Sequence, residues 1–218
     1  MNKKYLLTII ILLFAISIIF MLIGNKTASL SGSTITFFED QDNKEENNYM
    51  KAIDRKDFVF PDDHGAHPEY LTEWWYYTGN LLTDDGRHFG YQLTFFRRAI
   101  SDQFDGLSAS NWASNQIYLA HFAVTDTVSD EHYVFDQISR GSAGLAGTSL
   151  DPLFSIWLKD WEILQLSDNV FQMNAGSDTV EINFTLTDTK GIIFHGDGGL
   201  SQKAFSRALS QQAEVDIR

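Results

Sequence analysis

The chain has 218 residues, and its 29 Asp and Glu against 16 Lys and Arg give a formal net charge of −13. This acidic balance excludes nucleic-acid binding through clustered cations. Cysteine is absent, which excludes a disulfide scaffold, a thiolate zinc site, a thiol nucleophile and a lipid anchor on Cys. Hydrophobic residues make up 44% of the chain and aromatic residues 14%, so much of it can form a packed core.

The N-terminus has the pattern of an export segment. Lys3 and Lys4 precede an apolar run over residues 5–23. A cleaved signal peptide has an apolar region of about 7–15 residues, whereas a membrane-spanning helix needs about 20. We therefore predict that residues 1–24 are a signal anchor in the inner (cytoplasmic) membrane, with the rest of the chain extracytoplasmic. The alternative is a cleaved signal peptide, which would leave a periplasmic or secreted protein.

A polar linker is predicted after this segment, over residues 25–56. It includes the run from Glu39 to Asn48, in which acidic and amide side chains dominate. Such a composition buries too little apolar surface to order itself. The linker is therefore expected to hold a domain away from the membrane.

Apolar runs separated by turn residues follow one another regularly from residue 58 onward. Over residues 180–186, apolar side chains alternate with polar ones, which is the period of a half-buried strand. The turn Asp84-Asp85-Gly86 predicts a hairpin with its glycine in the left-handed conformation. Residues Gly141–Gly147 are predicted to form a flexible loop. The predicted strands are Tyr70–Leu82, His88–Arg98, Gln116–Thr125, His132–Ile138, Phe154–Leu158, Trp161–Leu166, Val170–Asn174, Thr179–Thr187 and Ile192–His195.

These elements indicate an all-β, antiparallel domain over residues 57–203, because helical spacing is hard to find after residue 56. Short, hairpin-linked strands at regular intervals are typical of an up-and-down barrel or a sandwich. The meandering order favours the barrel, which with about eight strands is wide enough to hold one small ligand.

Aromatic side chains occupy both faces of the first two predicted strands, since residues of alternating parity point to opposite faces. They form either the lining of a pocket for a large apolar ligand or an ordinary core with a covered outer face. The predicted ligand-binding residues, which include a nearby arginine, are Trp74, Trp75, Tyr76, Tyr77, Tyr91, Phe95 and Arg97.

Four segments carry a resemblance to a known family. Residues 60–81, which read FPDDHGAHPEYLTEWWYYTGNL, resemble the opening motif of the AttH-like family, which includes the carotenoid 1,2-hydratases (hydroxyneurosporene synthases). Tyr91–Arg97, Leu119–Asp126 and His195–Lys203 are also similar to it, so that the resemblance covers about residues 58–203. It implies a lipocalin-like β-barrel that is normally repeated as a second lobe. Members with known chemistry add water across an isolated double bond of a long polyene.

Residues 204–218 depart from the family pattern, in which a strand leads into the second lobe. They are polar and weakly helical in character. We expect an atypical tail that results from a truncation or a frameshift, which would leave this chain as the first lobe alone.

Hydration of an isolated alkene needs an acid that protonates carbon, and aromatic faces that stabilise the cation before water captures it. A carboxyl group held among apolar rings is suited to this role. Glu73, beside Trp74 and Trp75, is the candidate acid. The alternative is that Glu73 binds backbone groups, or pairs with Arg97 or Arg98, and so stabilises the fold.

Three further residues are candidates for proton transfer. His121 lies on an apolar face, where it acts either as a proton shuttle or as a satisfied core histidine. His195 and Asp197 lie among glycines at a strand end. They form either a histidine–carboxylate pair at the barrel mouth or a plain turn.

Other site classes find little support. His64 and His67 have a superficial zinc spacing, but they lie in a loop with Gly and Pro and have no Cys partner. The sequence has no nucleophile elbow for Ser–His–Asp hydrolysis, no phosphate loop and no dinucleotide fingerprint. We therefore predict no metal and no cofactor.

Three functions remain open. The first is a membrane-tethered, lipocalin-like protein that binds a hydrophobic lipid or isoprenoid-like ligand. The second is a hydratase or secreted hydrolase-like enzyme that needs a second lobe, with Glu73, His121, His195 and Asp197 as catalytic residues. The third is an accessory module of an envelope transporter, which would use the outside of the barrel as its interface.

Overall fold

The computed structural model describes residues 48–101, 110, 112–202, 209–211 and 213–217. Within these residues the regular structure is strand, apart from a single 3-10 turn, η1 (Asp62–His64). The prediction of an all-β, antiparallel fold is confirmed. No helix among these residues is long and apolar enough to cross a membrane. The predicted anchor over residues 5–23 lies outside the described residues.

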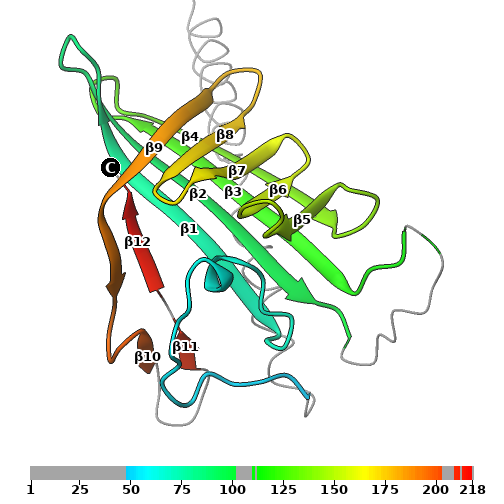
Figure 1. Cartoon of the computed structure of the whole chain (residues 1–218). Coiled ribbons are helices and arrows are strands. Elements are labelled where there is room, and N and C mark those ends of the chain that lie inside the picture. Colours follow the sequence, from blue (N-terminus) through cyan, green and yellow to red (C-terminus); the bar gives the residue numbers. More distant parts are fainter. Residues whose placement is uncertain (1–47, 102–109, 111, 203–208, 212, 218) are drawn as a thin grey trace, which may run out of the picture. The chain divides into compact units, whose positions relative to one another are not determined.

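The first sheet is an antiparallel meander. Its strands pair in the order in which they occur in the chain, each with the one before it (Figure 1). They are β1 (Thr72–Leu82), β2 (His88–Ala99), β3 (Gln116–Asp126) and β4 (Glu131–Arg140). The β1–β2 turn is closed by a hydrogen bond of 2.8 Å from the Gly86 amide to the Thr83 carbonyl. Gly86 has φ of 86°, so the predicted left-handed glycine is confirmed.

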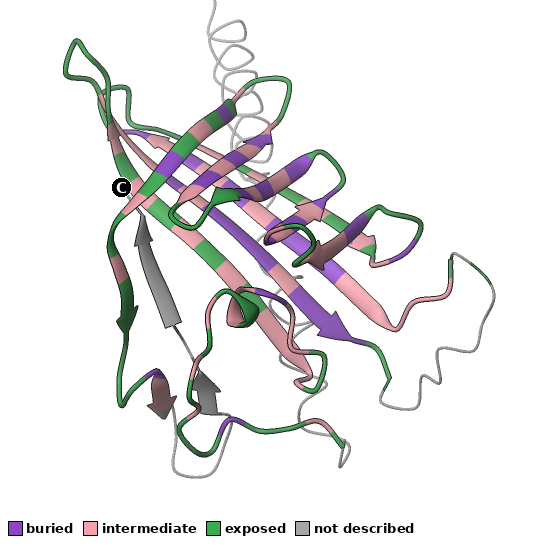
Figure 2. Ribbon diagram, in the orientation of Figure 1, coloured by how far each residue is buried: buried purple, intermediate pink, exposed green. Residues whose placement is uncertain are grey.

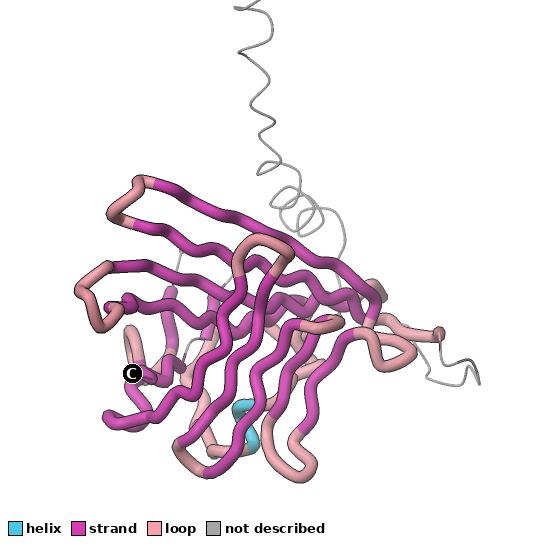
Figure 3. Tube along the Cα trace, turned by 90° about the horizontal axis from the view of Figure 1, so that it is seen from above, coloured by secondary structure: helices cyan, strands magenta, loops and turns pink. Residues whose placement is uncertain are grey.

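The second sheet continues the meander and lies over the first. Its strands run across those of the first sheet in Figure 1, and Figure 3 shows the same strands from above. They are β5 (Ala146–Ser149), β6 (Ser155–Leu158), β7 (Trp161–Ser167), β8 (Val170–Gly176), β9 (Glu181–Phe194) and β12 (Ala213–Ile217). A separate pair is formed by β10 (Leu200–Gln202) and β11 (Leu209–Gln211).

The core lies between the two sheets (Figure 2). The first sheet contributes the odd-numbered residues of β2 and the even-numbered residues of β3, and these meet the buried side chains of β6, β7 and β8. Trp161 is buried at the centre, where its ring lies 5.7 Å from that of Phe122 and its indole N–H donates to the Gly176 carbonyl. The fully buried apolar side chains include Leu93, Phe95, Phe122, Ile156, Leu158, Ile163 and Met173.

The structure differs from the predicted elements in two loops. The predicted loop Gly141–Gly147 ends early, because β5 already begins at Ala146. The predicted turn before Ile192 does not end a strand. Instead β9 continues through Gly191, whose φ of 73° and whose hydrogen bond to the Asp188 side chain mark a local bend.

The tail was predicted to be weakly helical, and this prediction is wrong for the residues that the structure describes. Residues 209–211 and 213–217 are strands. The second of these, β12, pairs with the distal half of β9, from Asp188 to Phe194, whereas β8 pairs with its proximal half. Pairing with an existing strand therefore overrides the weak local preference.

The last residues of the predicted linker lie against the domain. Met50 forms a parallel bridge with Tyr70, and its amide donates to the Glu69 carbonyl. Ala52 is buried, and Lys56 forms an ion pair with Asp63. The described part of the linker, residues 48–56, is therefore packed on the segment that precedes β1.

Candidate functional site

The segment that precedes β1 forms a loop that contacts both sheets. We call residues 58–71 the motif loop. The Trp75 indole N–H on β1 donates to the His64 carbonyl at 2.9 Å. The His64 ring lies 5.6 Å from that of Phe154 and 6.0 Å from that of Phe171 on β8. The motif loop therefore links the start of the first sheet to the second sheet.

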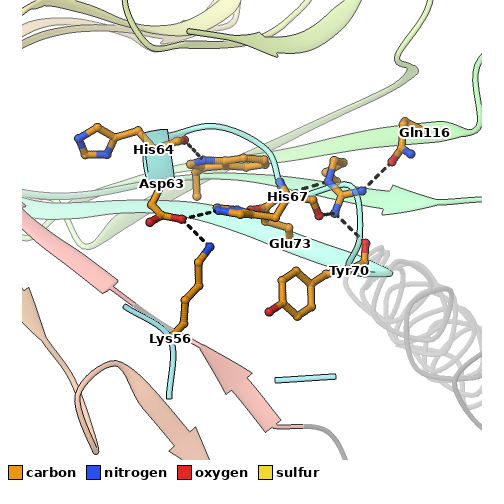
Figure 4. A network of polar contacts seen from close by, with 9 residues as sticks. Lys56, Asp63, His64, His67, Tyr70, Glu73 and Gln116 are labelled. Atoms are coloured by element: carbon orange, nitrogen blue, oxygen red, sulfur yellow. Dashed lines mark hydrogen bonds and ion pairs between the residues drawn. The ribbon is translucent and has the colours of Figure 1, made fainter. Parts of the chain in front are cut away.

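Arg97 on β2 is the centre of a polar network at this point, and Figure 4 labels its partners Glu73, His67, Tyr70 and Gln116. Its side chain is 1% exposed, and its Nε donates to Glu73 at 3.1 Å. Its Nη1 donates to the Gln116 Oε1 at 2.8 Å, and its Nη2 donates to the carbonyls of His67 and Tyr70. The planar guanidinium group suits this arrangement, because its donors are held in a fixed fork.

Glu73 on β1 is fully engaged in the same network. Its Oε2 accepts from the His67 amide at 2.9 Å as well as from Arg97. Its Oε1 contacts the Nδ1 of the His67 ring at 2.5 Å. The carboxylate therefore fixes the end of the motif loop to the first sheet, which is the stabilising alternative considered from the sequence.

The His67 ring lies between two carboxylates. Its Nδ1 contacts Glu73, and its Nε2 contacts the Oδ1 of Asp63 at 2.7 Å. Ionised carboxylates only accept hydrogen bonds, so both ring nitrogens act as donors when His67 carries a proton on each. Lys56 and the Val59 amide also donate to Asp63. This arrangement favours the imidazolium form of His67.

The pKa values of the two loop residues follow from these contacts. The hydrogen bond to Glu73 raises the pKa of His67, burial opposes this, and the bond to Asp63 adds to it, so that the pKa lies above its usual value. Burial raises the pKa of Asp63, but its hydrogen bonds from Lys56, the Val59 amide and His67 together outweigh burial and leave the pKa low.

The stability of the domain is expected to fall as the pH rises through the pKa of His67. A histidine whose pKa is raised by folding contributes stability that is fully present below its unfolded value, near 6.5, and is lost as the pH passes the folded value. Urea unfolding from about pH 6 to about pH 9 measures this. The parent should be more stable than His67→Gln at low pH, and this difference in the free energy of unfolding should shrink as the pH rises over that range. A difference that stays constant with pH would contradict the assignment. His88→Gln is the control, since the hydrogen bonds of the His88 ring to described residues go to Thr127 and Asn80, which carry no charge.

The two histidines of the zinc-like spacing do not face a common point. Figure 4 shows His67 between Asp63 and Glu73, with the ring of His64 pointing away from them. The His64 ring packs on Phe60, Phe154 and Phe171 instead. Burial lowers the pKa of His64. No group of three or more His, Cys, Asp or Glu residues within the described ranges has the arrangement of a metal site.

The structure divides the predicted ligand-binding residues between the two faces of the first sheet. Trp75, Tyr77, Tyr91 and Phe95 point toward the core, as does Arg97 at its rim. Trp74 and Tyr76 lie on the opposite face, which we call the outer face, with 40% and 44% of their surface exposed. The aromatic residues therefore form both a core and an exposed surface.

The predicted catalytic residues are not brought together. His121 lies on the outer face, in register with Tyr76, Thr94 and Asp136, whereas Glu73 points to the inner side. The His121 ring packs against Phe96 at 5.4 Å, and burial lowers its pKa, although Asp136 opposes this.

His195 and Asp197 lie elsewhere, in the exposed turn that follows β9. Asp197 forms an ion pair with Arg55 at the surface. Gly196, Gly198 and Gly199 all have positive φ, so this segment has the geometry of a tight turn. A plain turn is the arrangement that the structure shows here.

The sequence did not identify Asp63, His67, Lys56 or Gln116 as members of a common site. Asp63 was not singled out, and His67 was considered only as a metal ligand. Both lie in an irregular loop, for which residue spacing carries no information about contacts. The signal available in the sequence was that Asp63, His67 and Glu73 lie within one short segment, and that Arg97 lies on the next predicted strand.

Comparison with known proteins shows what the chain as a whole is similar to. A family model described as AttH-like matches residues 51–213. No curated protein sequence matches the chain. Among solved structures, the chain is similar to the crystal structure of a Nitrosomonas europaea protein assigned to AttH, with 29% identity and a TM-score of 0.60. The match covers 71% of this chain and 45% of the other, so the chain spans less than half the length of that structure.

Proposed function

The chain belongs to the AttH-like family, and on that premise we propose that it is an exported, membrane-tethered protein that binds a hydrophobic lipid or isoprenoid-like molecule. The basic residues Lys3 and Lys4 and the apolar run over residues 5–23 support the export and the tether. The ligand site that we propose is the outer face of the first sheet.

One observation carries the binding proposal. Four apolar side chains, one from each strand, stand in register across the outer face. We call this set the apolar row, and it consists of Trp74, Phe96, Leu119 and Ile138. Trp74 on β1 is 40% exposed, with Tyr76 beside it on the same face at 44%, and Ile138 on β4 is 54% exposed, whereas Leu119 between these strands is only 2% exposed. The exposed part of the row therefore lies on its two outer strands, with Trp74 and Tyr76 together on β1, and exposed apolar side chains that adjoin one another on a sheet mark an interaction surface.

The enzymatic alternative has weaker support. An acid that protonates an alkene needs a carboxyl group that reaches the substrate, but Glu73 is held by Arg97 and by two groups of His67. His121 lies on the other side of the sheet from Glu73. The binding function therefore fits the geometry of the described residues better than hydration does.

Replacing Trp74 by Ala is expected to weaken the binding of an apolar fluorescent probe, such as a retinoid alcohol, by about tenfold or more. A large exposed aromatic side chain contributes about 1.5–3 kcal/mol when a ligand covers it. The measurement is a fluorescence titration of the full chain held in amphipol.

The matched control is Trp112→Ala. Trp112 is 66% exposed and lies in the connection between β2 and β3, outside the apolar row. If both variants lose the same affinity for the probe, or if Trp74→Ala loses none, the outer face is not the ligand site.

A further inference from the structure

We propose that the outer face also binds an uncharged, hydroxyl-rich head group, such as a glycosyl group, so that the ligand is an amphiphile. This inference rests on the proposed function and makes it more specific. It is carried by a pocket that lies beyond the apolar row, toward the C-terminal end of β1.

The pocket has a volume of about 260 Å³ and opens on the outer face. Its floor is formed where the side chains are small, at Gly90 on β2 and Ala123 on β3. A Cβ atom added at Gly90 would meet only the Thr125 Cβ, at 4.0 Å, so the missing side chain leaves open space. The polar side chains around this floor are Thr78, Asn80, Gln92, Thr125 and His132.

Each of these polar side chains uses one group in a bond within the protein, and Asn80, Gln92 and His132 leave another group for a ligand. The Asn80 Oδ1 contacts His88, the Thr125 hydroxyl contacts the His132 Nδ1 at 2.8 Å, and the Thr78 hydroxyl donates to the Tyr91 carbonyl. In the described part of the chain, the Asn80 amide N–H groups, the Gln92 Oε1 and the His132 Nε2 have no protein partner. A hydroxyl group both donates and accepts, so it fits such a mixed set.

The charge of the lining selects against ionic head groups. Among the residues that the structure describes, no Asp, Glu, Lys or Arg lines the pocket. Recognition of a phosphate or carboxylate group usually relies on Arg or Lys. On the outer face the charged residues lie further along the strands: Asp136 is in register with Tyr76, and Arg98 and Arg140 are in register with Thr72. The pocket therefore complements an uncharged polar group.

Tyr76 and the apolar row complete the match to an amphiphile. Tyr76 precedes Thr78 by two residues on the same face, a separation of about 7 Å. Its exposed ring has an apolar face and a polar hydroxyl, which suits contact with a sugar ring. Trp74 lies about 13 Å from Thr78 along β1. One amphiphile of ordinary length can therefore place its apolar tail on the apolar row and its head group in the pocket.

The test compares three probes on the full chain in amphipol, by isothermal titration at probe concentrations below micelle formation. They are octyl glucoside, tetraethylene glycol monooctyl ether, which has the same chain and an uncharged head without a sugar ring, and free glucose. We expect the glucoside to bind about tenfold more tightly than the ether, as two or three added hydrogen bonds predict. Free glucose should bind far more weakly than either.

Two variants address the pocket itself. Gly90→Ile fills the floor, and a β-branched residue is well suited to a strand. Gln92→Leu removes an acceptor at nearly constant volume and serves if Gly90→Ile folds poorly. Either variant should bind the glucoside and the ether with about equal affinity. Trp112→Ala should keep the preference of the parent for the glucoside.

The outcomes separate the two proposals. Equal affinity of the parent for glucoside and ether, or an unchanged preference in both pocket variants, overturns the head-group pocket. If neither octyl probe binds the parent, or if Trp74→Ala does not weaken the ether, the binding function itself fails. If free glucose binds as tightly as octyl glucoside, the ligand is not an amphiphile, and the pocket binds a free saccharide instead.

Discussion

Replacing Arg97 by Ala is expected to lower the free energy of unfolding by about 3–5 kcal/mol. The guanidinium group is buried and donates to Glu73, to Gln116 and to two backbone carbonyls of the motif loop. Removing it takes the buried cation from Glu73, which keeps only His67, and leaves the carbonyls of His67 and Tyr70 without their donor; losing one partner of a buried pair costs about this much. Urea unfolding followed by tryptophan fluorescence measures the change.

The control for Arg97→Ala is Arg140→Ala. Arg140 is exposed at the end of β4, and substitutions at such positions usually change stability by less than about 0.5 kcal/mol. Arg97→Lys is a further test, because it keeps the charge but loses the fork, and it should recover only part of the stability. Similar midpoints for Arg97→Ala and Arg140→Ala would show that the network contributes little to stability.

The second large effect is expected from Glu73→Gln, which should destabilise the domain by about 3 kcal/mol or more. The change keeps the shape of the side chain but leaves Arg97 buried without an anion. A Gln side chain also offers one acceptor oxygen where the carboxylate offers two to the His67 amide, the His67 ring and Arg97. Thermal and urea unfolding both measure the loss.

This variant distinguishes a structural from a catalytic role for Glu73. Replacing a catalytic acid commonly leaves stability unchanged or raises it, because active sites are built at a cost in stability. A Glu73→Gln variant at least as stable as the parent would therefore revive the enzymatic function. Glu69→Gln is the matched control, since Glu69 is exposed in the same segment. In the double variant with Arg97→Ala the losses should be less than additive, because the two side chains interact directly.

The strands were predictable because their signal is local. Alternation over residues 180–186 places the proximal half of β9, and Gly86 places the first hairpin. The distal half of β9 was not predictable in the same way. A bend at Gly191 looks like the end of a strand in the sequence, and only pairing with β12, a strand distant in the chain, shows that β9 continues.

The assignment of faces was harder than the assignment of strands. Period-two spacing separates Trp74 and Tyr76 from Trp75 and Tyr77, but it does not indicate which set faces the core when both are aromatic. The answer depends on the second sheet, whose buried residues meet only one side of the first. For the same reason the sequence grouped Glu73 with His121, which the sheet separates.

The polar network illustrates a further limit. Pairing of Glu73 with Arg97 was among the alternatives raised from the sequence, and the register places these two residues opposite each other. The role of His67 was not predictable, because it depends on the path of the motif loop. That path is set by contacts with residues as distant as Phe154 and Phe171, which contact the His64 ring.

The meander has a consequence for how the chain reaches its native state. From β1 to β4, and again from β5 to β9, each strand pairs with its neighbour in sequence. Pairings of this kind close short loops and give a low contact order for a β protein, which favours rapid folding. The contacts of the motif loop are different, since they join His67 to Arg97 and His64 to Phe171 across long stretches of chain. Each sheet can therefore assemble while the chain emerges. The polar network can form once β3 has been made, because Gln116 is its last member in the chain, whereas the contacts of His64 with Phe154 and Phe171 form only with the second sheet.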